Sequence, residues 1–320
     1  MPHYPALLDP WSEALEMGAG TVIALLVATQ GSAYRHCGAA LAIAPDGRTA
    51  GALTSGCIEA ELIMQAATIR AHQTPARLRY GEGSPVFDLR LPCGGAIEVL
   101  LFLVHDQAIL RDLARRRAAR QPVSLIISPQ GRLSLTAYGN TGPVDDGFAL
   151  GFLPPLRHII MGTGAEALVF TGLVAGLGHE HMLLSHDEMT LLSARDMRYQ
   201  TRRLQQLADM ADILIDADTA VTLFYHDHDH EPEVLRQILR TDAFYIGAQG
   251  SSRSQQTRLA RLQRLGVPAA QLTRLRGPIG LIPSTRDPQT LAVSTLAEIM
   301  QVANMRGTAR FCEAVPLPCL

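Results

Sequence analysis

Two cysteines in the first third of the chain lie in settings that favour chemistry at sulfur. Cys57 comes directly before a stretch with helical periodicity, so the positive end of the helix dipole is expected to lower the pKa of its thiol and enrich the thiolate. Cys93 lies in a turn with little side-chain bulk, where amides can face a ligand and a large planar group can approach. Thiolates in such positions are nucleophiles or ligands for soft metals, so Cys57 and Cys93 are candidate metal ligands.

The residues around the two thiols are small. Ser55 and Gly56 precede the first cysteine, and Gly94 and Gly95 follow the second, so all four are candidate cofactor-binding residues. The two cysteines stand 36 positions apart, at 57 and 93, with no Cys-x-x-Cys pair, which does not match a structural zinc site. The alternative is that each thiol is a small buried apolar group, an explanation that fits the other three cysteines better.

A glycine-rich turn in the second half matches the Gly-x-Gly-x-x-Gly/Ala pattern of dinucleotide-binding folds. The residues are Gly162-Thr163-Gly164-Ala165-Glu166-Ala167, after a short apolar strand and before a helix. Gly162 and Gly164 permit a tight turn and the helix start favours a phosphate, so both are candidate cofactor-binding residues. The acidic residue expected about 20 positions on is missing, because Ser185 stands there and Asp187 comes two positions late. A phosphate-bearing ligand and a purely architectural turn remain alternatives, and the pattern does not favour NAD(P).

Two other segments contain residues suited to binding. His226, His228 and His230 alternate with aspartates, so in an extended segment they would share one face and present imidazoles to zinc, nickel or copper. The alternative is a polar turn between a strand and a helix. Arg253 lies in Gly250-Ser251-Ser252-Arg253 ahead of a helix, where it would hold a phosphate with the local amides; alternatively a serine caps the helix and Arg253 is solvated.

The composition limits the class of protein. With 320 residues, 47% of them apolar and 18% charged, the chain can form two packed domains. A net charge of -2 gives no field that attracts nucleic acid or an anionic membrane, so small molecules and proteins are the expected partners. All 28 basic residues are arginines, which excludes lysine Schiff-base chemistry and a Walker-type phosphate loop. Five cysteines and no stretch of about 18 apolar residues indicate reduced thiols and a cytoplasmic protein.

The first half is predicted to be a mixed α/β domain with hairpins. Apolar runs rich in β-branched residues indicate strands, and apolar residues at three-and-four spacing indicate helices. The predicted elements are a strand at 21–29, a hairpin of 41–44 and 49–54 around Pro45-Asp46-Gly47, a helix at 58–73, a strand at 96–104 and a helix at 107–120.

The second half is predicted to be a Rossmann-like domain with a parallel sheet, because short apolar strands alternate with helices. Strands are expected at 157–161, 181–184, 213–215 or 220–224, and 243–246. Residues 139–155 are rich in Gly, Pro and Asp and lack periodicity, which is typical of a linker. We therefore expect a front domain at 1–145, a Rossmann-like domain at 156–305 and a tail at 306–320.

The cysteine motifs occur together in one known family. In Ser55-Gly56-Cys57-Ile58-Glu59 and Leu91-Pro92-Cys93-Gly94-Gly95 the sequence resembles the XdhC/CoxI family, and the resemblance extends along nearly the whole chain. The further matching segments are Gly31-Ser32-Ala33-Tyr34-Arg35, Ile97-Glu98, Tyr225-His226-Asp227-His228, Tyr245-Ile246-Gly247, Gly250-Ser251-Ser252-Arg253, Pro278-Ile279-Gly280 and the helix at 291–299. The sequence departs from the family pattern at Tyr34, where Pro is usual, at Ala165, where His is usual, and at Ser185-His186, where two Asp residues are common.

The resemblance implies a function. Members of the family are accessory proteins that bind the molybdenum cofactor, help obtain its sulfurated form and deliver it to molybdenum hydroxylases such as xanthine dehydrogenase or aldehyde oxidoreductases. It thus implies a non-enzymatic maturation chaperone whose partners are an apo hydroxylase, a cysteine desulfurase and a molybdopterin nucleotidyltransferase; we also expect a homodimer. The cofactor carries a dithiolene-bound metal, a flat pterin and a phosphate or dinucleotide tail, which suits thiols near the metal and amides near the anion.

Two other classes of protein remain as alternatives. An NAD(P)-dependent oxidoreductase would use the Gly162 turn, although no proton donor paired with a substrate pocket is identifiable. A metal-dependent regulator or metal-storage protein would use the histidines at 226–230. The molybdenum cofactor chaperone is the function we expect, with Cys57 and Cys93 at the cofactor.

Overall fold

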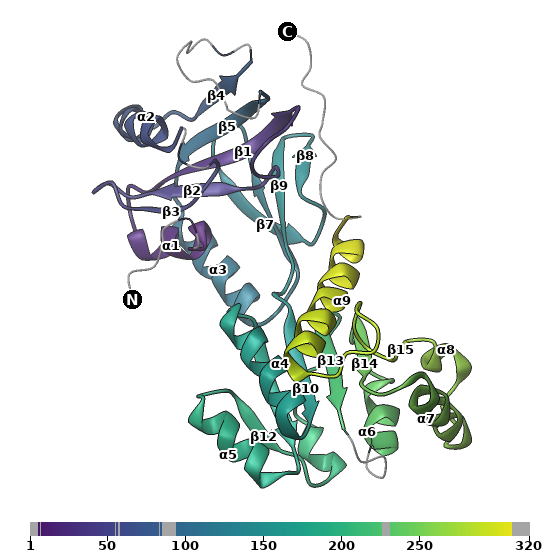
Figure 1. Ribbon diagram of the computed structural model, residues 1–320. Coiled ribbons are helices and arrows are strands. Elements are labelled where there is room, and N and C mark those ends of the chain that lie inside the picture. Colours follow the sequence, from purple (N-terminus) through teal and green to yellow (C-terminus); the bar gives the residue numbers. More distant parts are fainter. Residues whose placement is uncertain are drawn as a thin grey trace. The chain divides into compact units, whose positions relative to one another are not determined.

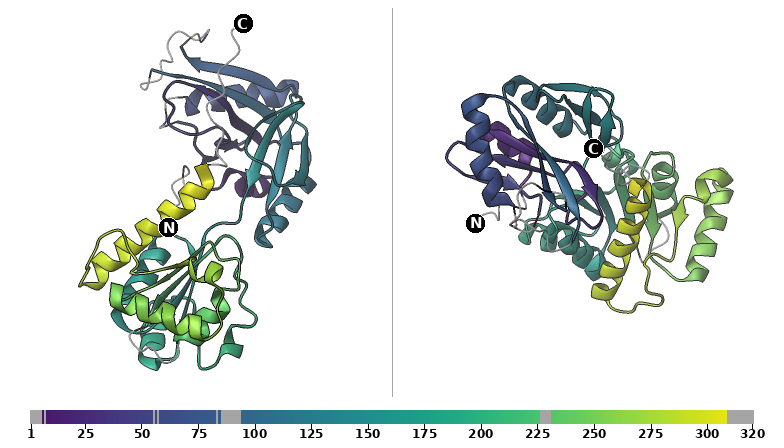
Figure 2. Two further views of the ribbon diagram at one scale, coloured as in Figure 1. Left: turned by 90° about the vertical axis from the view of Figure 1, so that its right-hand side faces the viewer. Right: turned by 90° about the horizontal axis from the view of Figure 1, so that it is seen from above.

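The computed structural model describes residues 6, 8–54, 56, 58–82, 84, 94–225 and 231–308. The chain divides into two compact units (Figures 1 and 2), with the boundary between Pro154 and Pro155. Over the described residues, no helix combines the length and the apolar character needed to span a membrane.

A five-stranded antiparallel sheet forms the first part of the front unit. Its strands, in spatial order, are β3 (Thr49–Gly51), β2 (Ala40–Ile43), β1 (Val22–Gln30), β5 (Ala96–Leu103) and β4 (Ala76–Gly81). β1 lies at the centre because its apolar run is buried on both faces. The predicted hairpin is confirmed, since β2 and β3 pair antiparallel around the turn at 45–47.

Two layers cover the faces of this sheet. On one face lies α2 (Glu59–His72), which buries Leu62, Ala66 and Ile69 against it. The opposite face packs against α1 (Pro10–Met17), α3 (Gln107–Ala118) and a second antiparallel sheet. In spatial order, the strands of the second sheet are β7 (Leu133–Ala137), β6 (Val123–Ile127), β9 (Gly147–Phe152) and β8 (Gly142–Val144). The front unit is therefore mixed α/β, as the sequence predicted.

The prediction of a linker at residues 139–155 is wrong for most of this segment. β8 and β9 lie within it, and Phe148 and Leu150 of β9 are buried in the core between the two sheets. Gly147 lets β9 begin close to β6, because a Cβ atom there would lie 2.1 Å from the carbonyl oxygen of Ile127. The glycines of this segment thus permit close strand packing, although their abundance is also typical of linkers.

The second unit contains a six-stranded parallel sheet (Figure 2). In spatial order, its strands are β12 (Thr201–Arg203), β11 (Glu180–Ser185), β10 (Arg157–Gly162), β13 (Thr219–Phe224), β14 (Tyr245–Ala248) and β15 (Leu275–Arg276). Every adjacent pair is parallel, and the order 3-2-1-4-5-6 is that of a Rossmann sheet. The Rossmann-like prediction is confirmed. Of the two alternatives for one strand, the segment at 220–224 forms it and the segment at 213–215 does not.

Helices cover both faces of the parallel sheet (Figures 1 and 2). One face carries α4 (Gly164–Gly176), α5 (Glu188–Asp196) and α9 (Pro288–Thr308), and α4 lies against α9. The other face carries the 3-10 helix η2 (Leu207–Met210), α6 (Glu231–Ile238), α7 (Ser252–Arg264) and α8 (Ala269–Leu272). The loops that lead into these helices therefore lie at the carboxyl ends of the strands.

A buried histidine lies in the centre of this sheet. His158 on β10 is fully buried, and its Nε2 lies 3.1 Å from Nδ1 of His179, whose ring stacks on it. Its Nδ1 atom has no hydrogen-bond partner among the described residues. Burial, together with the nearby His179 and His181, lowers the pKa of His158 from 6.5 to about 3. The side chain is therefore neutral in the folded protein at physiological pH.

We expect the second unit to lose stability as the pH falls below about 6.5. The unfolded chain takes up a proton on His158 below that pH, whereas the folded chain does so only near pH 3, so each pH unit between the two costs about 1.4 kcal/mol. Urea unfolding at pH 7 and pH 5 measures this slope. A His158→Leu variant should show a shallower slope, and a variant of the exposed His72, His72→Gln, should keep the original one. Equal slopes in all three proteins would contradict the assignment.

Candidate functional site

Three chain segments converge at one end of the five-stranded sheet of the front unit. The end of β1, the end of β4 and the start of β5 meet there, with Gln30 and Gly81 both opposite Ala96. A Cβ atom on Gly95 would lie 2.3 Å from the carbonyl oxygen of Ser32, and one on Gly81 would lie 2.1 Å from the carbonyl oxygen of Gly95. Only glycine fits these two positions, so the backbone itself forms this end of the sheet.

The glycines beside the two cysteines have open space around them. Gly56 and Gly94 are exposed, have φ values of 104° and 72°, and would meet nothing within 4 Å if they carried a Cβ atom. Ser55, Cys57 and Cys93 lie outside the described residues. Their roles as cofactor-binding residues and metal ligands therefore stay predictions.

A glutamate at the start of α2 holds the segment that precedes it. Oε1 of Glu59 accepts hydrogen bonds from the backbone amides of Leu53 (3.3 Å) and Thr54 (2.8 Å). Its Oε2 accepts from the Thr54 hydroxyl (2.6 Å) and the Ile58 amide (3.2 Å). Burial raises the pKa of Glu59, but the hydrogen bonds from Thr54 and Ile58 outweigh burial and hold it below its usual value. One carboxylate thus holds Leu53, Thr54 and Ile58, which lie on either side of Cys57 in the sequence.

A second glutamate ties α2 to the glycine-rich end of the sheet. Oε2 of Glu61, in the first turn of α2, accepts a hydrogen bond from the hydroxyl of Tyr80. Tyr80 is buried on β4, directly before Gly81, and both burial and the hydrogen bond to Glu61 raise its pKa. The start of α2 and the start of β5 are therefore held at the same end of the sheet. These two starts directly follow the two cysteines in sequence.

In the second unit, the Gly162 turn adopts the geometry of a Rossmann turn, but its Gly164 amide is hydrogen-bonded within the protein. A Cβ atom on Gly162 would lie 2.4 Å from the carbonyl oxygen of Phe224, so glycine permits the close approach of β10 to β13. The Gly164 amide donates to the hydroxyl of Thr190 at 2.9 Å, and that hydroxyl donates to Oδ2 of Asp187 at 2.6 Å. The amide that would otherwise face a phosphate is thus already bonded.

The two residues considered as ribose ligands, Ser185 and Asp187, also form hydrogen bonds within the protein. Asp187 caps α5 by accepting from the amide of Thr190 at 2.8 Å. Ser185 is fully buried at the end of β11, and its hydroxyl accepts from the amide of Asp187. The described residues of this turn therefore favour an architectural role over a dinucleotide site.

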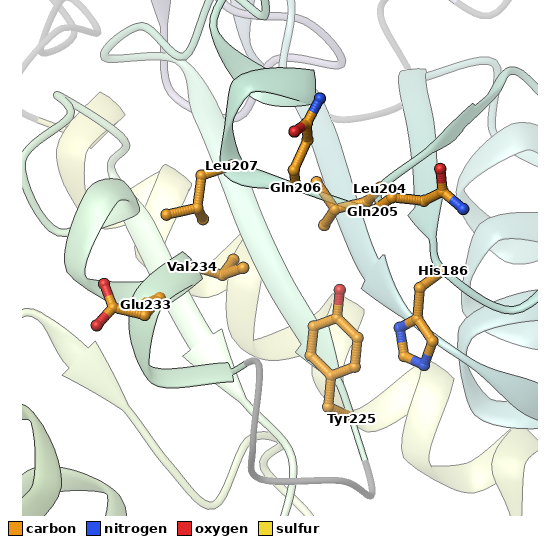
Figure 3. Close-up of a pocket in the computed structure, with 8 residues that line it drawn as sticks. All are labelled: His186, Leu204, Gln205, Gln206, Leu207, Tyr225, Glu233 and Val234. Atoms are coloured by element: carbon orange, nitrogen blue, oxygen red, sulfur yellow. The ribbon is translucent and has the colours of Figure 1, made fainter.

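A cavity of about 460 Å³ opens beside the turn, at the carboxyl ends of β11 and β13 (Figure 3). His186 and Tyr225 form one wall and stack with their ring centroids 5.8 Å apart and an interplanar angle of 14°. Burial and the negative charge of Glu231 raise the pKa of Tyr225, so its hydroxyl stays protonated. Gln205 and Glu233 also line the cavity and, among the described residues, no basic side chain other than His186 does. The lining suits an uncharged ring better than a phosphate.

Arg253 lines a different cavity, at the carboxyl ends of β14 and β15, together with Arg286. Ser251 caps α7 by accepting a hydrogen bond from the amide of Ser254. This is the serine cap expected from the sequence as the alternative to a phosphate site. Arg253 is exposed and faces a cavity of about 780 Å³, so the cap and a binding role for Arg253 are compatible.

Sequence reasoning missed several of these residues. Glu59 was noted only within a motif, although an acidic residue in the first turn of a helix is a common signal for a local backbone contact. Arg286 lies in a loop with no motif, and the bond between Tyr80 and Glu61 joins residues 19 positions apart. The histidines at 226–230 lie outside the described residues, and the described residues contain no group of three metal-binding side chains.

Known proteins match both units. A family model described as the XdhC Rossmann domain matches residues 159–299, and one described as the XdhC and CoxI family matches residues 14–81. A crystal structure described as a xanthine dehydrogenase from Bacillus halodurans has the same fold, with a TM-score of 0.73, 22% identity, and coverage of 94% of this chain and 98% of that one.

Curated relatives match nearly the whole chain. The sequence is 23% identical over 340 residues to a probable xanthine dehydrogenase subunit from Bacillus subtilis, across 94% of this chain and 98% of that protein. It is 35% identical over 292 residues to the molybdenum cofactor insertion chaperone PaoD of Escherichia coli K12, across 91% of this chain and 86% of PaoD. With this relative and both domain matches, the chain belongs to the XdhC and CoxI family.

Proposed function

We propose that this protein is a maturation chaperone that holds the molybdenum cofactor, in its sulfurated form, and delivers it to a molybdenum hydroxylase such as xanthine dehydrogenase or an aldehyde oxidoreductase. The similarity to PaoD along most of both chains is the observation that carries the proposal. An apo hydroxylase is the partner this function requires. A cysteine desulfurase, a molybdopterin nucleotidyltransferase, a homodimeric state and a cytoplasmic location belong to the same proposal.

The glycine-rich end of the front sheet supports this function. A flat pterin needs a surface without side chains, and the exposed Gly56 and Gly94 provide backbone that such a ring can approach. Cys57 and Cys93 supply soft ligands for the metal or for its sulfur. Glu59 and the bond between Glu61 and Tyr80 fix the starts of α2 and β5, so the two thiols would be presented from one rigid end of the sheet.

The alternative of an NAD(P)-dependent oxidoreductase is less well supported. The strand order is that of dinucleotide-binding folds, but the Gly164 amide already donates to Thr190, and Asp187 already caps α5. Titration with NADH and NADPH, followed by nicotinamide fluorescence, separates the two functions. Tight binding with turnover would favour the oxidoreductase.

We expect the double variant Cys57→Ala, Cys93→Ala to lose bound cofactor when the protein is produced in a molybdenum-competent host. Without both thiols the metal has no soft protein ligand at this site, so the pterin released and oxidised from purified protein should fall by about tenfold or more, the equivalent of 1.4 kcal/mol of lost binding. Activation of an apo hydroxylase by the purified variant should fall in parallel.

The matched control is Cys37→Ala, because Cys37 packs against the core between the two sheets and belongs to neither cysteine motif. It should keep its pterin and its activating effect. Unchanged cofactor content and unchanged activation in the double cysteine variant would refute the proposal.

A further inference from the structure

The cavity at the carboxyl ends of β14 and β15 carries uncompensated positive charge. Arg253 and Arg286 line it, and none of its described lining residues is acidic. Within the part of the chain that the structure describes, neither guanidinium group has a carboxylate or other hydrogen-bond acceptor. By contrast, Arg157 and Arg202, which line another cavity of this unit, pair with Glu180 and Asp212. Two unpaired guanidinium groups that face one cavity indicate an anionic ligand.

The start of α7 adds backbone donors to this charge. The Ser251 hydroxyl accepts from the Ser254 amide and the Ser251 carbonyl accepts from the Gln255 amide, which leaves the amides of Ser252 and Arg253 for an acceptor outside the helix. The first turn of α7 contains no acidic residue. The start of α4 at the Gly162 turn is the opposite case, because it has Glu166 in its first turn. An anion is thus better accommodated at α7 than at the Gly162 turn.

One wall of the cavity is held in place by α9. Oε2 of Glu298 accepts from the Gly280 amide at 2.6 Å, and Oγ of Ser294 accepts from the Ile282 amide at 2.7 Å. Gly280 has a φ of 102°, and a Cβ atom there would lie 2.6 Å from Oγ of Ser294, so glycine is required for this contact. The loop at 278–282 is therefore fixed before any ligand arrives.

The same cavity contains groups suited to an organic body. The Oε1 atom of Gln249 is buried and has no hydrogen-bond partner among the described residues, which leaves it ready to accept from a ligand. Leu281 and Ile282 line the cavity and are exposed at 50% and 48%, so they offer an apolar surface. A small inorganic anion would use neither feature.

We infer that this cavity binds the phosphate or pyrophosphate group of an organic ligand, of the class of nucleoside diphosphates, with Arg253 and Arg286 on the anion and with Gln249 and the two apolar side chains on the attached body. This inference goes beyond the proposed function, because it assigns a site in the second unit without reference to molybdenum. Of the two phosphate sites considered from the sequence, it keeps the one at Arg253 and not the one at the Gly162 turn.

Isothermal titration of the full-length protein with CDP, ADP and inorganic pyrophosphate tests the inference. We expect at least one nucleoside diphosphate to bind about tenfold more tightly than pyrophosphate, and the preference between CDP and ADP identifies the base. Arg253→Gln and Arg286→Gln should each weaken this binding by about tenfold, because each removes a charged hydrogen-bond donor. Arg264→Gln is the matched control, since Arg264 is on α7 but outside the cavity and bonds the carbonyl of Ala260.

Absence of binding for all three probes at millimolar concentration would overturn the inference, and so would affinities that the double variant Arg253→Gln, Arg286→Gln leaves unchanged. Equal affinities for pyrophosphate and the nucleoside diphosphates would overturn the assignment of an organic ligand. None of the probes contains molybdenum, so such a failure would leave the proposal on Cys57 and Cys93 standing.

Discussion

Replacement of Arg258 by methionine should destabilise the second unit by about 3–5 kcal/mol, because it removes the guanidinium group that compensates the buried charge of Glu231. Arg258 and Glu231 are each 2% exposed, and their side chains lie 2.8 Å apart. The same guanidinium donates to Oε1 of Gln255 and to the carbonyl oxygen of Gln249. Gln255 in turn donates to the carbonyl oxygen of Leu275 at 3.3 Å. This network joins the segments that follow β13 and β14 to β15.

Urea unfolding followed by circular dichroism measures the loss. The matched control is Arg195→Met, because Arg195 forms an ion pair with Glu188 at 3.6 Å in which both side chains are at least 45% exposed. Such an exposed pair contributes no more than about 1 kcal/mol to the free energy of unfolding. The double variant Arg258→Met, Glu231→Leu should recover much of the lost stability, since it also removes the buried negative charge. A loss for Arg258→Met no larger than that for Arg195→Met would show that the buried pair is not important for stability.

Replacement of Glu59 by alanine should produce the second large effect, a loss of bound cofactor close to that of the double cysteine variant. The substitution removes the acceptor for three backbone amides and one hydroxyl, which belong to Leu53, Thr54 and Ile58. Loss of hydrogen bonds to partly buried donors costs about 1–3 kcal/mol, so a modest loss of overall stability should accompany the effect. Pterin released from purified protein measures the first effect and thermal unfolding the second.

Two comparisons sharpen this test. Thr54→Val removes a single hydroxyl donor and should give an intermediate cofactor content, and Glu16→Gln, an exposed change on α1, should give a normal one. Because the pKa of Glu59 lies below its usual value in the folded protein, its contribution is present above the unfolded pKa of 4.5 and is lost as the pH falls through the folded value. Full cofactor content in Glu59→Ala would show that the hydrogen bonds of Glu59 to Leu53, Thr54 and Ile58 do not matter for binding.

The sequence predicted the elements whose apolar pattern is continuous. β1, α2, β5 and the first strands of the parallel sheet were found within one or two residues, because burial on one or both faces leaves a clear period. β4 was missed because Arg77 and Arg79 interrupt it, and both arginines pair with Glu98 on β5. Such pairs across strands depend on a neighbour that no local pattern reveals.

The residues of the candidate site could be predicted only where a short sequence motif contains them. Gly94 and Gly95 were identified because they leave little side-chain bulk beside Cys93. The structure gives open space around Gly94, whereas Gly95 is in close contact with the carbonyl oxygen of Ser32. The Gly162 turn was recognised as a motif, but the use of its Gly164 amide by Thr190 depends on a residue 26 positions away. Arg253 in the first turn of α7 and Arg286 in the loop before α9 line the same cavity although they are 33 positions apart, at 253 and 286, so their association is a property of the fold.

The position of α9 at the end of the second unit has a consequence for biosynthesis. Leu291, Leu296 and Ile299 of α9 complete the core beneath β10 and β13, and Glu298 and Ser294 hold the loop after β15. While the ribosome is still making α9, α4 and α5 already lie on this face of the parallel sheet, but the apolar residues that α9 covers are accessible. The second unit therefore completes its fold only after translation of residues 288–308, and a nascent chain arrested before them is expected to be bound by general chaperones or degraded.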